Sequence, residues 1–404
     1  VYAYILILLF TSCSSDDNSN PLTTNPSIEN SAVIDTLSTE AIKQNYTIFL
    51  KAMATPDDKI AEALSTIKYD IVFAKVEYKA KDPFGVEKTL SGLVIYPVLP
   101  ASDKNKTLSV VSIQHGTLTY ESKAPSKINP KSLDPIRDII GIVSASHENG
   151  YIVLQPDYFG YGSDEINPHY YELAASLATA SRKLIENIPA YTSKQGLSIN
   201  YNNLYLFGYS EGGGATISTL KSFSENSSNF NNYITVAGAG AYDKLATADY
   251  IVQQTTGDSP QFSASYAWVV LTYNSVYKIN RDINALYSES VAPEISNYVG
   301  NDLIMQTKSI PAAPAEVFNS AFAQNFLNRS DKDFVNAFSN NNVSDFNAKG
   351  KVYLVHGEKD TWVPTFNTLH ATENFKKRGV DVTETLYPGG THATTYPVFA
   401  KIAI

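Results

Sequence analysis

A serine held between glycines, directly after a short apolar run, is the feature that most limits how this chain can fold. The stretch "FGYSEGGGAT" (207–216) places Ser210 in a Gly-x-Ser-x-Gly pattern that follows the run "NLYLFG". A strand that turns this sharply into a helix needs neighbours without side chains, and the turn holds the serine hydroxyl clear of the sheet. The hydroxyl then stands at the positive end of the helix. The pattern therefore predicts a strand, a tight turn at Ser210 and a helix.

Strand-like and helical segments alternate along most of the chain. A hairpin is expected from "YDIVFAKVEYKA" and "EKTLSGLVIYP", with its turn at Asp82–Gly85. The other expected strands are short apolar runs at 108–114, 151–157, 203–208, 233–240, 351–357 and 382–390. Helices are expected over 31–66, 170–188 and 365–378, and directly after Ser210. This alternation predicts a mainly parallel sheet with helices on both faces.

One long segment, 245–345, has helical patterns but no convincing buried strand. Within it, "FSASYAWVVLTYNSVY" (262–277) repeats apolar and aromatic residues at helical spacing, including Tyr266 and Tyr273. We expect a helical cap inserted between two strands of the sheet, with both tyrosines lining a substrate pocket. The alternative is that this aromatic face belongs to the core.

A serine hydroxyl becomes a nucleophile when a neighbouring base accepts its proton and a third group orients that base. "VYLVHGEKDTWVP" ends an expected strand and places Asp360 in the next loop. "TLYPGGTHATTYP" ends the last expected strand and places His392 in the loop beyond it. Serine, carboxylate and histidine thus follow one another at strand ends, with Glu358 and Asp243 as alternative candidates for the carboxylate.

Taken together, these segments resemble the α/β-hydrolases, and within that fold the chain is similar to secretory lipases and related serine esterases. The resemblance covers about residues 65–404 and rests on "QHGT", "PDYFGYGSDE", "GYSEGG", "HGEKDTWVP" and "GGTHA". It implies that Ser210 is the nucleophile and His392 the general base and acid. It also implies that Asp360 orients His392.

The same resemblance implies an oxyanion hole made by the backbone N–H groups of Glu211 and Thr117. Among the remaining histidines, His169 in "INPHYY" is the candidate for lining the substrate pocket. The other histidines are expected to lie at the surface or to shape loops: His115, His147, His356 and His370.

The overall composition excludes several other functions. The net charge is −9 without a long run of either sign, which argues against a nucleic-acid partner. The single cysteine, Cys13, rules out an internal disulfide and a cysteine-based zinc site. No metal-ligand cluster and no phosphate-binding glycine loop is evident in the sequence, so we expect neither a metal nor another cofactor.

The N-terminal residues resemble a targeting segment. "VYAYILILLF" (1–10) is too short to span a bilayer but suits the core of a signal peptide. A small residue before Cys13, followed by "SSDDN", resembles the lipoprotein signal of Bacteroidetes surface proteins. This resemblance implies a signal peptide over 1–12, a lipid on Cys13 and a flexible tether over 13–30, in an outer-membrane or cell-surface protein. An ordinary cleaved signal peptide, giving a periplasmic or secreted protein, is the alternative.

We therefore expect an α/β-hydrolase core over 31–244 and 346–404, with a helical cap or lid over 245–345. The expected function is that of a serine esterase or lipase that cleaves carboxylic esters, of small molecules or polymers, through an acyl-enzyme. Membrane contact is expected only through the N-terminal lipid. A serine peptidase on the same fold and a non-catalytic surface binding protein are the alternatives. The acyl and alcohol specificity and the oligomeric state stay open.

Overall fold

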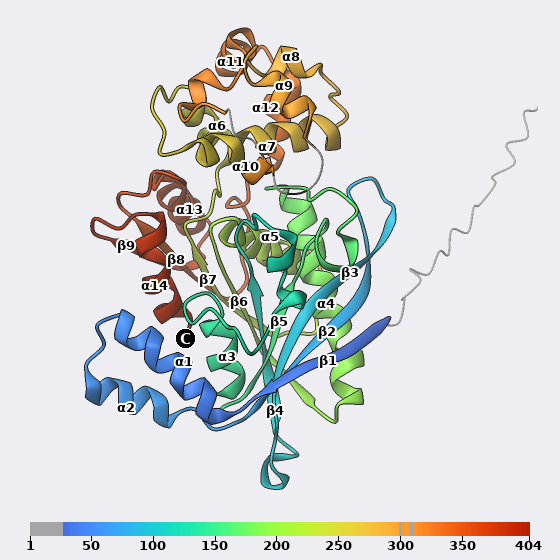
Figure 1. The fold of residues 1–404 in the computed structure, drawn as a ribbon, viewed down its shortest axis with the longest axis vertical. Helices are drawn as coiled ribbons and strands as arrows, with labels where there is room; N and C mark the ends of the chain where they lie inside the picture. The colour runs from blue at the N-terminus through green and yellow to red at the C-terminus, as the bar shows by residue number, and fades with distance from the viewer. Residues whose placement is uncertain (1–26, 299–300, 302, 307–309) are drawn as a thin grey trace, which may run out of the picture.

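A computed structural model describes residues 27–298, 301, 303–306 and 310–404. In this part of the chain a nine-stranded sheet crosses the molecule in the order β1-β2-β3-β5-β4-β6-β7-β8-β9 (Figure 1). The strands are β1 (Asn30–Leu37), β2 (Ile71–Lys81), β3 (Glu87–Pro97), β4 (Thr107–Gln114), β5 (Tyr151–Pro156), β6 (Ser198–Tyr209), β7 (Asn232–Gly238), β8 (Lys351–Gly357) and β9 (Asp381–Tyr387).

The sheet is antiparallel from β1 to β3, which also pairs antiparallel with β5, whereas all pairs among β4 to β9 are parallel. Alternate side chains of the inner strands enter two different cores: Val110 belongs to one apolar cluster and Val111 to the other. This alternation requires helices on both faces, because each face is apolar. The predicted fold class, a mainly parallel sheet flanked by helices, is confirmed, as is the predicted hairpin of β2 and β3.

Helices from distant parts of the chain cover the two faces. The apolar side chains of α4 and α5 enter the cluster that contains Val110, and those of α1, α3 and α14 enter the cluster that contains Val111. The helices outside the segment between β7 and β8 are α1 (Thr39–Ala52), α2 (Asp57–Ser65), α3 (Ile139–Ser146), α4 (Ala174–Lys194), α5 (Glu211–Glu225), α13 (Phe366–Lys377) and α14 (His392–Ala403).

The structure corrects two of the predicted elements. Residues 31–66 were expected to be helical throughout, but Asn30–Leu37 forms β1 before α1 begins. This strand lies at the sheet edge and most of its side chains are exposed. Its sequence therefore lacks the apolar pattern of a buried strand, and its pairing with β2 decides its conformation. His392 was expected in a loop, but it is the first residue of α14, which Thr391 caps together with Thr394.

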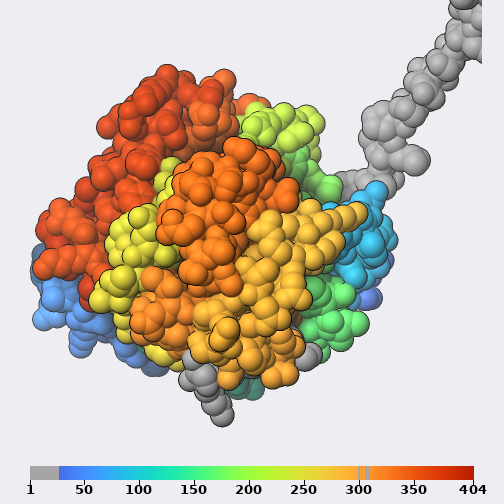
Figure 2. Space-filling model, turned by 90° about the horizontal axis from the view of Figure 1, so that it is seen from above, coloured from blue at the N-terminus to red at the C-terminus, as the bar shows by residue number. Residues whose placement is uncertain are grey.

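Between β7 and β8 the chain forms a group of helices, which we call the cap. They are α6 (Lys244–Ile251), α7 (Pro260–Val276), α8 (Ile283–Leu286), α9 (Ala292–Ser296), α10 (Leu303–Gln306), α11 (Ser320–Leu327) and α12 (Lys332–Asn340). Figure 1 shows them gathered at one end of the molecule, beyond the sheet. Seen onto that end in Figure 2, the cap covers the middle of the molecule.

The predicted signal peptide (1–12), Cys13 and the tether as far as residue 26 lie outside the described residues. Among the helices that are described, none combines the length and the apolar character that crossing a membrane requires.

Candidate active site

The chain turns tightly at Ser210, between β6 and α5. Ser210 has a φ of 61° and a ψ of −127°, in a region that residues other than glycine rarely occupy. A Cβ atom on Gly208 would lie 2.2 Å from the carbonyl oxygen of Gly212, and one on Gly212 would lie 2.1 Å from that of Gln114. Both glycines are therefore required because the strand, the helix and β4 approach one another so closely. This is the strand, turn and helix that the glycine pattern predicts.

Ser210, His392 and Asp360 form a hydrogen-bonded line across three strand ends. The Nε2 atom of His392 is 2.9 Å from the Oγ atom of Ser210, and its Nδ1 atom is 2.7 Å from the Oδ2 atom of Asp360. A carboxylate only accepts, so Nδ1 carries the ring proton and Nε2 accepts from the Ser210 hydroxyl. This is the geometry in which a histidine can take the proton of a serine.

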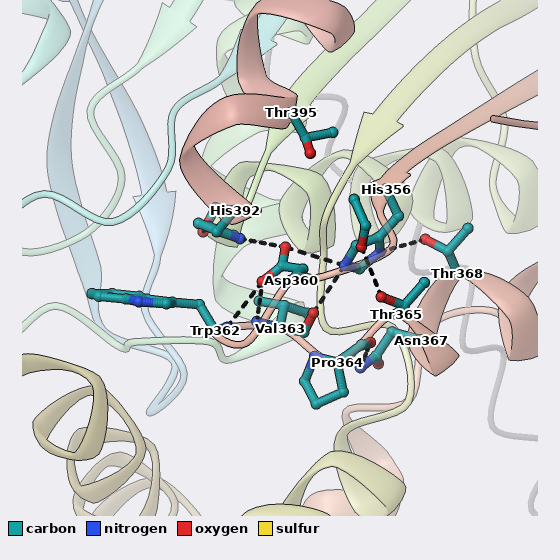
Figure 3. A network of polar contacts seen from close by, with 12 residues as sticks. His356, Asp360, Trp362, Val363, Pro364, Thr365, Asn367, Thr368, His392 and Thr395 are labelled. Atoms are coloured by element: carbon teal, nitrogen blue, oxygen red, sulfur yellow. Dashed lines mark hydrogen bonds and ion pairs between the residues drawn. The ribbon is translucent and has the colours of Figure 1, made fainter. Parts of the chain in front are cut away.

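Asp360 lies in a loop that directs several donors at its carboxylate (Figure 3). Its Oδ1 atom accepts from the backbone amides of Trp362 and Val363, both at 2.9 Å. Burial alone would raise the pKa of this carboxyl, but hydrogen bonds from His356 and His392 hold it well below its usual range. Asp360 is therefore ionised near neutral pH, as a group that orients an imidazole must be.

His356 supports this carboxylate, although the sequence predicted only that it shapes a loop. Its Nε2 atom is 2.9 Å from the carbonyl oxygen of Val363 and 3.3 Å from the Oδ2 atom of Asp360. The carbonyl can only accept, so Nε2 carries the proton and Nδ1 accepts from the Thr368 hydroxyl at 2.8 Å. The four-residue spacing of His356 and Asp360 across the end of β8 was the signal that could have revealed this contact.

The two alternative carboxylates lie elsewhere. Asp243 caps the N-terminus of α6 and pairs with His370. The Oδ2 atom of Asp243 is 2.9 Å from the Nδ1 atom of His370. Glu358 is exposed and accepts a hydrogen bond from the amide of Gly389 at 3.3 Å. Neither makes a hydrogen bond or ion pair with His392 among the described residues, so Asp360 is the carboxylate that the geometry favours.

The predicted oxyanion hole consists of the backbone amides of Glu211 and Thr117, and the segments of both residues adjoin Ser210. Glu211 begins α5, where a helix leaves its first N–H groups without an intrahelical partner. Thr117 follows Gly116, and a Cβ atom on that glycine would lie only 3.5 Å from the Cβ atom of Ser210. The adjacency of both segments to the serine agrees with this expectation, and the role of their amides stays a prediction.

A cavity of about 610 Å³ opens onto this site and extends beneath the cap. Ser210, His392 and Thr117 line it, and so does Trp362, whose ring stacks on that of His392 with the centroids 6.1 Å apart. The apolar side chains that the cap contributes to its lining are those of Ala248, Ile251, Val252, Val269, Val270, Phe318, Phe322, Phe326 and Phe338. The cavity can therefore hold an apolar chain attached to a group at Ser210. Over the described ranges, no group of His, Cys, Asp and Glu side chains is arranged to hold a metal ion.

Of the three residues predicted to contact substrate, only Tyr266 lines this cavity. Tyr273 is fully buried, and its hydroxyl donates to the carbonyl oxygen of Glu172 at 3.0 Å. His169 is also buried, with Nε2 2.8 Å from Oε1 of Glu211. The expectation for Tyr273 and His169 is therefore corrected: both pack behind the cavity wall. α7 is buried on nearly all sides, so its spacing could not separate residues that face a cavity from residues of the core.

Comparison with solved structures identifies proteins that share the fold of this chain. No protein-family model and no curated protein matches the chain. A candidate hydrolase from Legionella pneumophila has 22% sequence identity and a TM-score of 0.77 over 93% of this chain and 96% of its own. The rice cell wall degrading esterase LipA from Xanthomonas oryzae has 17% identity and a TM-score of 0.74, covering 94% and 95%. Candida antarctica lipase A has 14% identity and a TM-score of 0.63, covering 91% and 77%.

Proposed function

We propose that this chain, which has the α/β-hydrolase fold, is a serine hydrolase that cleaves carboxylic esters through an acyl-enzyme. The observation that carries the proposal is the line from Ser210 through His392 to Asp360 at one end of an apolar cavity. Two of the similar structures are named as an esterase and a lipase, which favours an ester over a peptide as the substrate.

The reaction would proceed in two halves. The Oγ atom of Ser210 attacks the ester carbonyl carbon while Nε2 of His392 takes its proton, and the amides of Thr117 and Glu211 stabilise the resulting oxyanion. The intermediate then expels the alcohol, which leaves with the proton of His392, and the acyl group stays on Ser210. Water attacks this acyl-enzyme with His392 again as the base. The second intermediate then expels the Oγ atom of Ser210, which takes the proton back from His392, and the acid is released. Asp360 stays ionised and stabilises the imidazolium.

The apolar part of the cavity would hold the acyl chain. Burial of each methylene group there contributes about 0.8 kcal/mol, which is available to the transition state as well as to the bound ester. Phe322 and Phe326 project from α11 into this part of the lining. An acyl chain rather than a charged peptide matches such a surface.

A labelling experiment tests the proposal. The wild-type protein should react with a fluorophosphonate at Ser210 and hydrolyse p-nitrophenyl esters in preference to peptide anilides. Ser210→Ala should abolish labelling and slow ester turnover by about 10⁴- to 10⁶-fold, because the nucleophile is lost. Ser122 lies in the wall of the same cavity, so Ser122→Ala is the matched control. This variant should keep both the fluorophosphonate labelling and the ester turnover. A Ser210→Ala variant with a tenth of the wild-type rate would refute the assignment, and a wild-type protein without label or turnover would indicate a binding protein.

A further inference from the structure

A buried ion pair lies in the wall of the cavity, apart from Ser210, His392 and Asp360. Lys244 is the first residue of α6, and Glu172 lies in the loop before α4. Both residues line the cavity, although they are only 5% and 8% exposed. The Nζ atom of Lys244 donates a hydrogen bond to the Oε2 atom of Glu172.

The pair lies against α5. A Cβ atom on Gly214 would lie 3.6 Å from Oε2 of Glu172 and 3.7 Å from Nζ of Lys244. Gly214 follows Ser210 by about one helical turn, which corresponds to roughly 6 Å along the axis. From Lys244, one face of α6, the first helix of the cap, continues the lining through Thr247, Ala248 and Ile251. Ser210, the ion pair and this face of α6 therefore line one and the same cavity.

Neither Lys244 nor Glu172 is a residue type that the local backbone at its position favours. A cation in the first turn of a helix opposes the helix dipole, and Lys244 occupies that position in α6. Glu172 has a φ of 55°, which is strained for any residue except glycine. A buried ion pair is also weak evidence for stability, since a well-packed apolar pair of similar volume often serves as well. Features that break local rules in this way collect at functional sites.

The pair, which lines the cavity, retains unused hydrogen-bonding capacity. The ammonium group of Lys244 has three N–H donors, and among the described residues only Glu172 accepts from it. No described residue donates to the Oε1 atom of Glu172. A donor and an acceptor thus lie side by side. A hydroxyl group complements both because it accepts and donates, whereas a methylene group complements neither and a carboxylate would be repelled by Glu172.

We propose that Lys244 and Glu172 form a subsite for a hydroxyl group on the acyl chain, so that the enzyme prefers hydroxylated acyl esters to plain ones. The inference rests on the proposed function, because it takes an acyl group on Ser210 as its starting point. The hydroxyl would accept from Nζ of Lys244 and donate to Oε1 of Glu172.

The test compares methyl esters of octanoic acid that carry one hydroxyl, moved carbon by carbon along the chain, with plain methyl octanoate. Acid release is followed in a pH-stat. At one or two chain positions kcat/KM should exceed that of the plain ester by on the order of tenfold, as a hydrogen bond to a charged group would give. The methoxy analogue at the same position should lose most of this preference, since it accepts but cannot donate.

Variants show whether the ion pair causes the preference. Lys244→Met leaves a buried carboxylate without its partner and endangers folding, so the double variant Lys244→Met/Glu172→Met, which removes both the donor and the acceptor, is the main test. Its ratio of kcat/KM for hydroxylated over plain ester should fall to about one. Lys332→Met is the matched control, because Lys332 also begins a helix directly after a capping aspartate but is exposed. This control should keep the wild-type ratio.

Three outcomes would overturn the subsite while leaving the esterase in place. They are a ratio near one at every chain position in the wild-type protein, a preference that survives in the double variant, and a preference for a hydroxyl on the alcohol half alone. A wild-type protein that hydrolyses neither ester and takes no fluorophosphonate label would instead refute the proposed function itself.

Discussion

At the scale of single residues, the site combines strain with converging hydrogen bonds. Ser210 is held in an unfavourable backbone conformation, and Asp360 receives two backbone amides in addition to two histidine rings. Such a carboxylate cannot turn away from His392 without losing several bonds at once. The geometry therefore assigns the orientation of His392 to Asp360, and this assignment can be tested by substitution.

Asp360→Asn should lower kcat for ester hydrolysis by about 10⁴-fold, because an amide can hold His392 in the wrong tautomer. Glu358→Gln and Asp243→Asn are the matched controls, since each neutralises a carboxylate that does not contact His392. Steady-state rates on one p-nitrophenyl ester suffice. Equal damage from either control would move the acid to that residue.

The lowered pKa of Asp360 also predicts a pH dependence of stability. A carboxyl whose pKa is lower in the folded than in the unfolded state stabilises the fold above its unfolded pKa of about 3.9 and loses this effect as the pH falls. The free energy of unfolding should therefore decrease more steeply in wild type than in Asp360→Asn between about pH 5 and about pH 3. Urea unfolding across this range measures the difference. A difference that stays constant with pH would contradict the prediction.

At the scale of elements, the apolar cavity is a product of helices that meet only in the folded chain. Residues of α6 and α7 form part of its wall, and Phe322 and Phe326 of α11 extend the apolar surface. Because α11 contributes two rings in successive turns, it is placed to limit the length of chain that fits. Under the proposed function, the packing of the cap helices would decide which acyl chains fit.

Activity should therefore depend on acyl length in a way that α11 controls. In wild type, kcat/KM should climb over the first few carbons and then level off as the cavity fills, with each methylene contributing about 0.8 kcal/mol or less. Phe322→Leu should shift the plateau to longer chains, because the smaller side chain leaves more room. A series of p-nitrophenyl esters from acetate upward measures both profiles.

Phe346→Leu provides the matched control for this series. Phe346 is buried against Phe375 and does not line the cavity, so the same truncation there should destabilise the protein without moving the plateau. A wild-type profile that is flat from acetate to octanoate would reject the acyl role of the cavity.

At the scale of the whole molecule, we propose that the protein is exported and anchored by a lipid on Cys13. The proposal rests on the apolar run 1–10 and the small residues around a lone cysteine. A hydrolase core on a polar tether would then act on substrates at a membrane surface.

Cys13→Ala should release the protein into the soluble fraction, because stable anchoring requires acyl chains that only the cysteine can carry. Fractionation of cells followed by immunoblotting measures the distribution. Ser14→Ala changes the neighbouring residue and should leave the protein with the membranes. Identical fractionation of Cys13→Ala and wild type would refute the anchor.

The sequence by itself determined the turn at Ser210 and the strands after whose ends Asp360 and His392 follow in the chain. The reason is local: a turn that close excludes side chains at two glycines, and parallel strands present their carboxyl ends at one edge of the sheet. The fold class followed from the same alternation of apolar strands and helices.

Tertiary structure alone decided which side chains face the cavity. It also decided that Asn30–Leu37 pairs with β2 as the edge strand β1. Glu172 and Lys244 are 72 residues apart, and no pattern in the sequence joins them. His169 and Tyr273 pack behind the cavity wall rather than in it, because contacts between distant elements decide which way each buried side chain faces. Local spacing specifies a helix or a strand, but only packing specifies what each of its faces meets.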